Sequence, residues 1–182
     1  MEEILKQIKL KEDKGFSFDL AQASFELLAH KILGSLPCYF EVKRYRVSVE
    51  RRKNKYNEMV SMSEAVVVVK VDGEKKLSVS ESLDESGSDR GPVNALSKAL
   101  SKDLGPYQSI IADLRLVDFK VRITQGGTEA VTRVIIDCED SQGHRWSTVG
   151  VSANIVDASF EALLDAINWK LIRDYNVEGP LR

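Results

Sequence analysis

The sequence predicts an α/β protein of the α+β type, with two pseudo-symmetric βββα modules preceded by a small helical linker subdomain. The apolar residues have a helical period before Pro37 and alternate as in strands after it. The order strand–strand–strand–helix then occurs twice. We therefore expect a linker subdomain at 1–36, a main domain at 37–176 with modules 37–105 and 106–176, and a tail at 177–182.

The linker subdomain is expected to hold two helices. The first covers Glu2–Lys11, where Ile4 and Ile8 belong to a partial apolar stripe. The second runs from Asp19, a suitable N-cap, to Lys31, and the following glycine and proline end it.

The two modules follow with similar spacing. In the first, strands are expected at 40–50, 62–71 and 75–82, and a helix at 92–104. The charged segment Arg51–Glu58 is read as an exposed loop, and Asp72-Gly73 as a tight hairpin turn. In the second, strands are expected at 114–124, 128–138 and 145–152, and a helix at 156–174, while the tail from Val177 on frays.

Short residue matches indicate that the modules arose by duplication. The matched runs, in order, are 45–49 with 119–123, 63–66 with 128–131, 76–78 with 145–147, and 95–100 with 162–167. A repeat of about 70 residues is too long for a solenoid unit. Duplication is therefore the better explanation of the shared element order.

Composition narrows the class of protein. The chain has 182 residues and a formal net charge of −2, which argues against a chain-wide nucleic-acid surface. No apolar run approaches the roughly 18 residues that a membrane span needs. Cys38 and Cys138 lack CxxC spacing and are expected to be reduced core thiols. We expect a cytoplasmic protein with neither nucleic acid nor membrane as partner.

Duplication suggests where a ligand binds. Two βββα modules that face each other about a pseudo-two-fold axis enclose a crevice lined twice by equivalent loops, and pockets favour such seams. Two glycine-containing loops have chemistry suited to a carboxylate: 87–93, which leads into a helix, and 125–128.

A catalytic site is not expected in this chain. His30 and His144 are isolated, so we predict no metal site, no catalytic residue and no cofactor here. The basic run at 44–55 is explained by strand alternation and an exposed loop.

Several longer runs resemble a known family. They are 91–96, 116–122, 127–134 and 146–155, with 15–18 and 23–28 upstream. Together they resemble the C-terminal regulatory domain of the 2-isopropylmalate synthase and citramalate synthase family, with a linker subdomain in its citramalate synthase form.

The resemblance implies a function. Enzymes of this family carry a (β/α)8 barrel that condenses acetyl-CoA with a 2-oxo acid on a divalent metal, and the barrel is absent from this chain. Their regulatory domain forms dimers and binds the end-product amino acid, leucine or isoleucine. The resemblance thus implies a homodimeric feedback-regulatory domain of an acyltransferase, with no catalysis by this chain alone.

The resemblance also implies the effector-binding residues. These are Arg90, Gly91, Pro92, Val93, Asn94, Leu116, Phe119, Ile123, Gln125, Gly126 and Ala130. The aliphatic side chain of the effector is expected against the apolar members of this set, and its carboxylate near the N–H groups at 91–93.

Two alternatives stay open. The family loop usually reads Gly-Asn-Gly-Pro, whereas this chain has Asp89-Arg90-Gly91-Pro92. This departure makes a dimerisation module with a decayed effector site the second hypothesis. A free-standing small enzyme is the third, and the lack of a histidine cluster argues against it.

Overall fold

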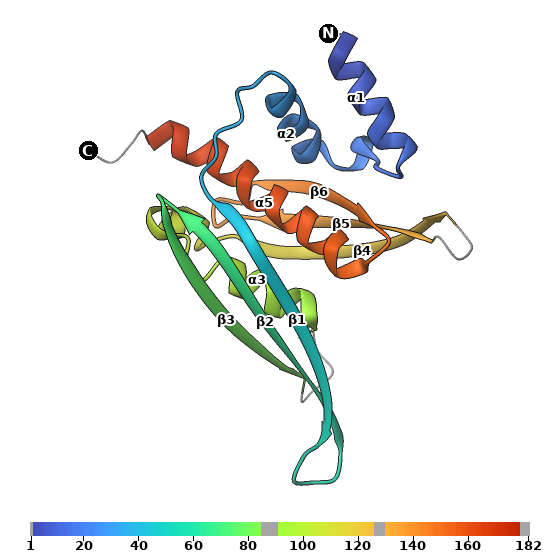
Figure 1. Cartoon of the computed structure of the whole chain (residues 1–182), viewed down its shortest axis with the longest axis vertical. Coiled ribbons are helices and arrows are strands. Elements are labelled where there is room, and N and C mark those ends of the chain that lie inside the picture. Colours follow the sequence, from blue (N-terminus) through green and yellow to red (C-terminus); the bar gives the residue numbers. More distant parts are fainter. Residues whose placement is uncertain (1, 85–90, 126–129, 179–182) are drawn as a thin grey trace. The chain divides into compact units, whose positions relative to one another are not determined.

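The structure is a computed structural model, and it describes residues 2–84, 91–125 and 130–178. The elements are α1 (Glu2–Asp13), the 3-10 helix η1 (Phe18–Leu20), α2 (Gln22–Ile32), β1 (Glu41–Lys53), β2 (Met59–Val71), β3 (Glu74–Asp84), α3 (Pro92–Leu100), η2 (Gly105–Tyr107), α4 (Gln108–Ile111), β4 (Arg115–Gln125), β5 (Val131–Glu139), β6 (Arg145–Ser152) and α5 (Ile155–Glu178). They form two three-stranded antiparallel sheets, β1–β2–β3 and β4–β5–β6 (Figure 1). The predicted fold class, two βββα modules preceded by helices, is confirmed.

The chain divides into two compact units, and each is described by itself. Unit 1 comprises Met1–Pro37 and Ser109–Arg182, and Unit 2 comprises Cys38–Gln108. The N-terminal helices therefore share a unit with the second sheet. The domain boundaries expected from the sequence stay a prediction.

In Unit 2, α3 covers one face of the sheet. Buried apolar side chains recur at every second residue on β2 and at helical spacing on α3, so each element has one buried apolar side. Val67 and Val69 of β2 lie two residues apart, point to this side and are buried. The buried stripe of α3 consists of Ala95, Leu96, Ala99 and Leu100. Asp72 and Gly73 join β2 to β3 with positive φ angles of 49° and 86°, which confirms the predicted tight turn.

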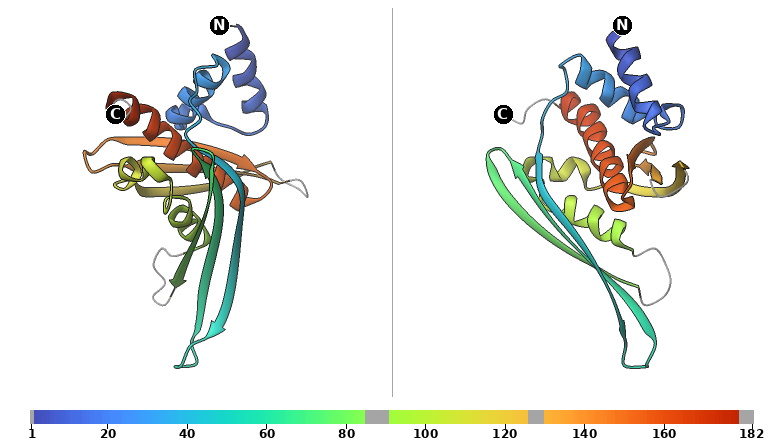
Figure 2. Two further views of the ribbon diagram at one scale, coloured as in Figure 1. Left: turned by 60° about the vertical axis from the view of Figure 1, so that its left-hand side comes forward. Right: turned by 45° about the vertical axis from the view of Figure 1, so that its right-hand side comes forward.

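In Unit 1, α5 packs closely against β5 and β6 (Figure 2). The Thr148 hydroxyl donates a hydrogen bond of 2.8 Å to the carbonyl of Ala162, which fixes the helix to β6. Gly150 lies directly under the helix: a Cβ there would be 1.9 Å from the carbonyl oxygen of Ala158. Only glycine allows the two backbones to approach this closely.

The N-terminal segment covers the opposite face of the same sheet. Phe16, Phe18 and Ala21 form a buried cluster with Ile135 and Val149, which point away from α5. The second sheet is therefore covered on both faces at β5 and β6.

The start of the second helix differs from the prediction. The sequence favours Asp19 as N-cap, but the chain forms η1 first and α2 begins after Ala21, which makes no side-chain cap bond. Ala21 is fully buried in the cluster with Phe18, so packing outweighs the capping preference of the aspartate.

The first hairpin is longer than predicted. β1 continues to Lys53, so the loop is confined to 54–58 instead of 51–58. The Asn54 side-chain oxygen accepts hydrogen bonds from the backbone N–H groups of Tyr56 and Glu58, at 2.9 and 3.0 Å. These bonds organise a short turn, which lets strand pairing continue.

Two helix ends also differ. α3 ends at Leu100 rather than at residue 104, because the Gln108 side chain bonds both the N–H of Leu104 and the carbonyl of Ser101 in a turn. The sequence did not predict η2 and α4, which follow this turn. α5 continues to Glu178, beyond its predicted end at Asp174.

One of the repeat matches places its residues on opposite faces. The match of 76–78 with 145–147 equates Leu77 with Trp146. Trp146 is buried on the α5 side, opposite Cys138, whereas Leu77 points away from α3 and is 61% exposed. Because side chains alternate along a strand, a one-residue offset exchanges the faces. The helix match has the same burial pattern in both modules and is confirmed.

Candidate functional site

The first group of predicted site residues begins α3 in Unit 2. Gly91 is the N-cap and makes no side-chain cap bond, and Pro92 occupies the first helical turn. The first turn of a helix has N–H groups without intrahelical partners, which favour an anion. The Asn94 side-chain oxygen is buried and has no hydrogen-bond partner among the described residues. An acceptor of this kind is suited to an ammonium group.

The second group lies on β4 in Unit 1. Leu116, Phe119 and Ile123 point to one face, because they pair with Cys138, Ile136 and Thr132 of β5. A bulge after Leu116 preserves this alignment. Since α5 packs on β5 and β6, it leaves β4 uncovered, and Ile123 is 70% exposed. The result is an exposed apolar strip of the kind that an aliphatic side chain contacts.

The other predicted site residues are placed as follows. Val93 and Ala130 are half-buried, and Gln125 ends β4. Arg90 and Gly126 lie outside the described residues. Because the two groups belong to different units, the predicted crevice and the complete site stay a prediction.

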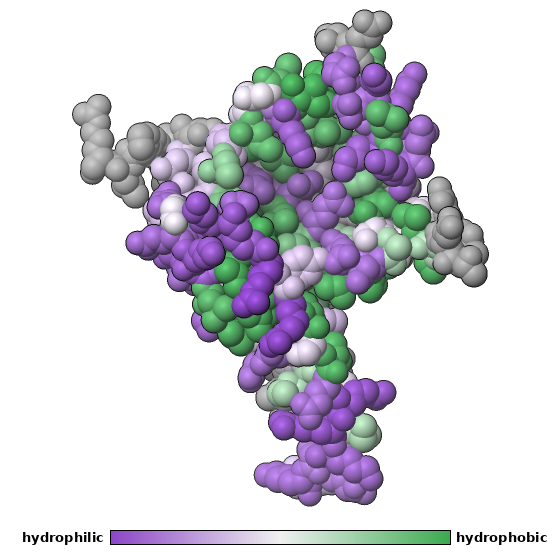
Figure 3. Space-filling view, in the orientation of Figure 1, coloured by the Kyte–Doolittle hydropathy of each residue, from purple (hydrophilic) through white to green (hydrophobic). Residues whose placement is uncertain are grey.

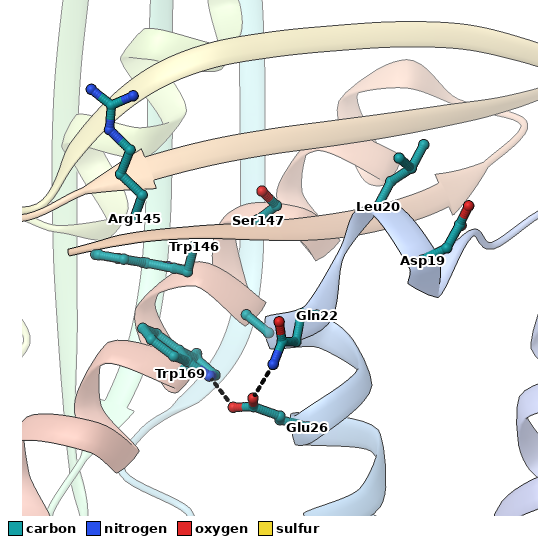
Figure 4. Close-up of a pocket in the computed structure, with 9 residues that line it drawn as sticks. Asp19, Leu20, Gln22, Glu26, Arg145, Trp146, Ser147 and Trp169 are labelled. Carbon is teal, nitrogen blue, oxygen red and sulfur yellow. Dashed lines mark hydrogen bonds between the residues drawn. The ribbon is translucent and has the colours of Figure 1, made fainter.

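Unit 1 also contains a pocket that the sequence did not predict. It has a volume of about 410 Å³, and its walls come from η1, α2, β6 and α5 (Figure 4). Trp146 and Trp169 stack at its base with ring centroids 5.2 Å apart. Glu26 accepts hydrogen bonds from the Trp169 indole N–H at 2.6 Å and the Gln22 amide at 3.2 Å. These groups satisfy one another, so the pocket is the seam along which α2 packs.

A cluster of buried charges fixes the β5–β6 turn to α5. Lys170 is 2% exposed and contacts Asp113 at 3.0 Å and Asp174 at 2.9 Å. Asp140, at the start of the turn, accepts a hydrogen bond from Arg173. The ring nitrogen of His144 lies 3.0 Å from Asp140, while half of the His144 side chain stays exposed.

Only one of the two cysteines occupies the expected environment. Cys138 is buried, and burial, with a contribution from the Asp137 charge, raises the pKa of its thiol to about 12. Cys38 is exposed, so the prediction of a core thiol is wrong there. It lies in the segment before β1, outside the sheet. Within the described ranges, no group of three or more His, Cys, Asp or Glu side chains is arranged to hold a metal.

A buried carboxylate joins α2 to α5. The Ser24 hydroxyl donates to Asp165 at 2.6 Å and accepts from the backbone N–H of Val149 at 3.0 Å. Burial raises the pKa of Asp165 to about 7, and the nearby Glu161 charge acts in the same direction. The hydrogen bond from Ser24 and the charges of Lys11 and Lys31 oppose this shift.

We expect Asp165→Asn to stabilise the chain above neutral pH. A raised folded-state pKa means that the folded protein holds the proton of Asp165 more tightly than the unfolded chain does. The stability that this proton contributes is lost as pH rises from about 4 to about 7. The slope is at most about 1.4 kcal/mol per pH unit. An asparagine still accepts the Ser24 bond without the charge. Urea unfolding of both proteins between pH 4 and 8 measures the difference.

The exposed α1 variant Glu12→Gln serves as the charge-matched control. Its unfolding free energy should follow that of the wild type across this range. A constant offset between Asp165→Asn and the wild type from pH 4 to pH 8 would contradict the assignment.

The two three-stranded sheets with their helices have the architecture expected of a regulatory and dimerisation domain. A family model described as the LeuA allosteric (dimerisation) domain matches residues 19–171, and the chain belongs to this family. This confirms the resemblance seen in the sequence.

The individual relatives are citramalate and 2-isopropylmalate synthases. The (R)-citramalate synthase of Geobacter sulfurreducens is 41% identical over 179 residues, which are 97% of this chain and 32% of the relative. That of Aquifex aeolicus is 37% identical over 176 residues, 96% of this chain and 31% of the relative. The 2-isopropylmalate synthase of Methanocaldococcus jannaschii is 29% identical over 167 residues, 92% of this chain and 28% of the relative. The chain spans about a third of the length of these relatives.

None of the helices in the described part of the chain is both long and apolar enough to cross a membrane.

Proposed function

We propose that this chain is the feedback-regulatory domain of an acetyl-CoA-dependent 2-oxo acid acyltransferase, a citramalate synthase or 2-isopropylmalate synthase, and that it binds isoleucine or leucine. It acts as a homodimer. The divalent metal and acetyl-CoA of the reaction bind to the catalytic part of such an enzyme.

The uncovered apolar face of β4 is the observation that carries the effector proposal. Leu116, Phe119 and Ile123 offer a surface that a branched aliphatic side chain desolvates. The start of α3, whose N-cap Gly91 makes no side-chain cap bond, supplies N–H groups for the carboxylate. The Asn94 oxygen, which has no partner among the described residues, accepts from the ammonium group. An aliphatic side chain, a carboxylate and an ammonium group are the three parts of a free aliphatic amino acid.

Thermal unfolding with added amino acids tests this proposal. A ligand that binds only the folded chain stabilises it by about 2.7 kcal/mol at a hundredfold excess over Kd. We expect the melting temperature to rise with L-isoleucine or L-leucine and to stay constant with D-isoleucine. Ile123→Ser should abolish the rise at little cost in stability because the side chain is exposed. Met59→Ser, at another exposed apolar position, should retain it.

The altered loop favours one competing function, a dimerisation module whose effector site has decayed. In that case neither amino acid changes the melting temperature of this chain. The double variant Asp89→Gly with Arg90→Asn restores the family loop and should then restore the response. If the wild type and this variant both fail to respond at millimolar concentration, the effector proposal is wrong.

A further inference from the structure

The face of the Unit 2 sheet that points away from α3 has an ordered pattern across β2 and β3. Four residue pairs lie directly opposite each other along this face: Lys70 with Lys75, Val68 with Leu77, Val66 with Val79, and Glu64 with Glu81. We call these eight residues the outer patch. Its apolar centre lies between a basic end and an acidic end, and the space-filling view shows hydrophobic surface over β2 and β3 flanked by hydrophilic surface (Figure 3).

The outer patch is open, unlike its equivalent in the other module. In Unit 1, Phe16 and Phe18 cover Ile135 and Val149 on the corresponding face. In Unit 2, Leu77 is 61% and Val79 37% exposed, so the described residues leave this face uncovered. Of the two three-stranded sheets, the one in Unit 1 therefore has a cover from its own unit on this face, and the one in Unit 2 has none among the described residues.

The charges at the two ends are unfavourable in an isolated sheet. Like charges directly opposite each other on neighbouring strands are destabilising, and here two such pairs occur, one of each sign. Each end has one neighbour of opposite sign on the same sheet: Glu64 has Arg46 at 3.5 Å, and Lys70 lies opposite Glu41 of β1. Arg44 of β1, opposite Val68, adds a further cation near the basic end. A partner with the reverse order of charges would relieve both ends.

We propose that a second copy of this chain covers the outer patch, face to face. The two-fold axis lies between the two faces and runs perpendicular to the strands. It passes between the Val68–Leu77 pair and the Val66–Val79 pair. Rotation about it places the basic end of each copy over the acidic end of the other. The valines and leucine of the two copies then meet in the centre. The pattern is therefore complementary to itself, as an isologous interface requires.

The contact is small. The patch covers seven residues along the strand, at about 3.3 Å per residue, so its area lies at the low end for protein interfaces. Arg44 and Arg46 of β1 remain at its solvated rim. We therefore expect weak association that depends on salt, because much of its specificity is electrostatic.

Charge reversal gives a direct test by sedimentation equilibrium of the 182-residue chain. Lys70→Glu with Lys75→Glu makes both ends acidic, and Glu64→Lys with Glu81→Lys makes both ends basic. Each variant alone should lose one association step, from dimer to monomer or from tetramer to dimer. An equimolar mixture of the two should regain it, because every contact in the mixed pair joins opposite charges.

Two controls keep the result specific. Lys53→Glu with Lys55→Glu makes the same charge change at the hairpin tip and should leave the association unchanged. Leu77→Asn weakens the apolar centre without changing charge and should reduce association. The proposal is wrong if the charge variants associate as the wild type does, or if folded variants fail to associate when mixed.

This inference is independent of the effector. None of the outer-patch residues belongs to the predicted effector site, so the response of melting temperature to isoleucine should persist in the charge variants. Loss of self-association with a retained response, or the reverse, therefore separates the two proposals.

Discussion

Gly150→Ala is expected to destabilise the chain more than any other single methyl addition considered. The new Cβ would lie 1.9 Å from the carbonyl oxygen of Ala158 and 2.9 Å from the backbone nitrogen of Ala162. Both obstacles are main-chain atoms of α5, so no rotamer change relieves the contact. Overpacking usually costs about 1–3 kcal/mol, and we expect at least the upper value here.

The expected loss corresponds to a fall in melting temperature of roughly 6 to 12 °C for a chain of this size. Gly91→Ala is the control, because a Cβ at that N-cap position meets no atom within 4 Å. It should change stability by no more than about 1 kcal/mol. A Gly150→Ala protein that melts with the wild type would show that α5 is not held this close to β6.

The order of elements could be predicted because the relevant patterns are local. Alternation identified all six strands, and the helical stripes of α3 and α5 have the burial expected from their repeat match. It was also predictable that Phe119 and Ile123 of β4 share a face, since they are four positions apart and side chains alternate along a strand. Leu116 joins this face only because of the bulge that follows it, which alternation alone does not predict.

Features that depend on tertiary packing were not predictable in this way. Ala21 is the N-cap of α2 because it is buried beside Phe18, and no cap signal in the sequence indicates that contact. Gly150 reads as an ordinary strand glycine until the path of α5 is known. The repeat match equated Leu77 with the buried Trp146, so the sequence did not indicate that Leu77 lies on the exposed outer patch. The unpartnered Asn94 oxygen likewise depends on packing around α3.

Asp140→Asn is the other change with a large expected effect, because Asp140 connects the β5–β6 turn with α5. Its side chain is 1% exposed, and one oxygen accepts from the backbone N–H groups of Gln142 and His144, at 3.0 and 2.9 Å. The other accepts from Arg173 and lies 3.7 Å from Lys170. An asparagine can keep the turn bonds, but its amide then faces the two cations without a charge.

The pH dependence follows from the same contacts. Burial alone would raise the pKa of Asp140, but the His144 backbone bond and the Arg173 guanidinium hold it below its usual range. Asp113, with bonds from Ser141 and Lys170 that outweigh its burial, has its pKa lowered to about 2. A lowered folded-state pKa contributes stability above the unfolded value near 4, and this contribution is lost as pH falls below it.

We therefore expect Asp140→Asn to lower the unfolding free energy by about 3 kcal/mol at pH 7, since removing one partner of a buried ion pair leaves the others uncompensated. The difference from the wild type should shrink as pH falls below about 4, where Asp140 of the unfolded wild type is protonated. Asp118→Asn is the control: Asp118 also pairs with a lysine, Lys120 at 2.8 Å, but both are exposed, so the change should be much smaller. Chemical unfolding at pH 7 and pH 3 measures both variants. Equal losses for Asp140→Asn and Asp118→Asn, or a loss from Asp140→Asn that is unchanged at pH 3, would show that this charge cluster does not hold α5 to the turn.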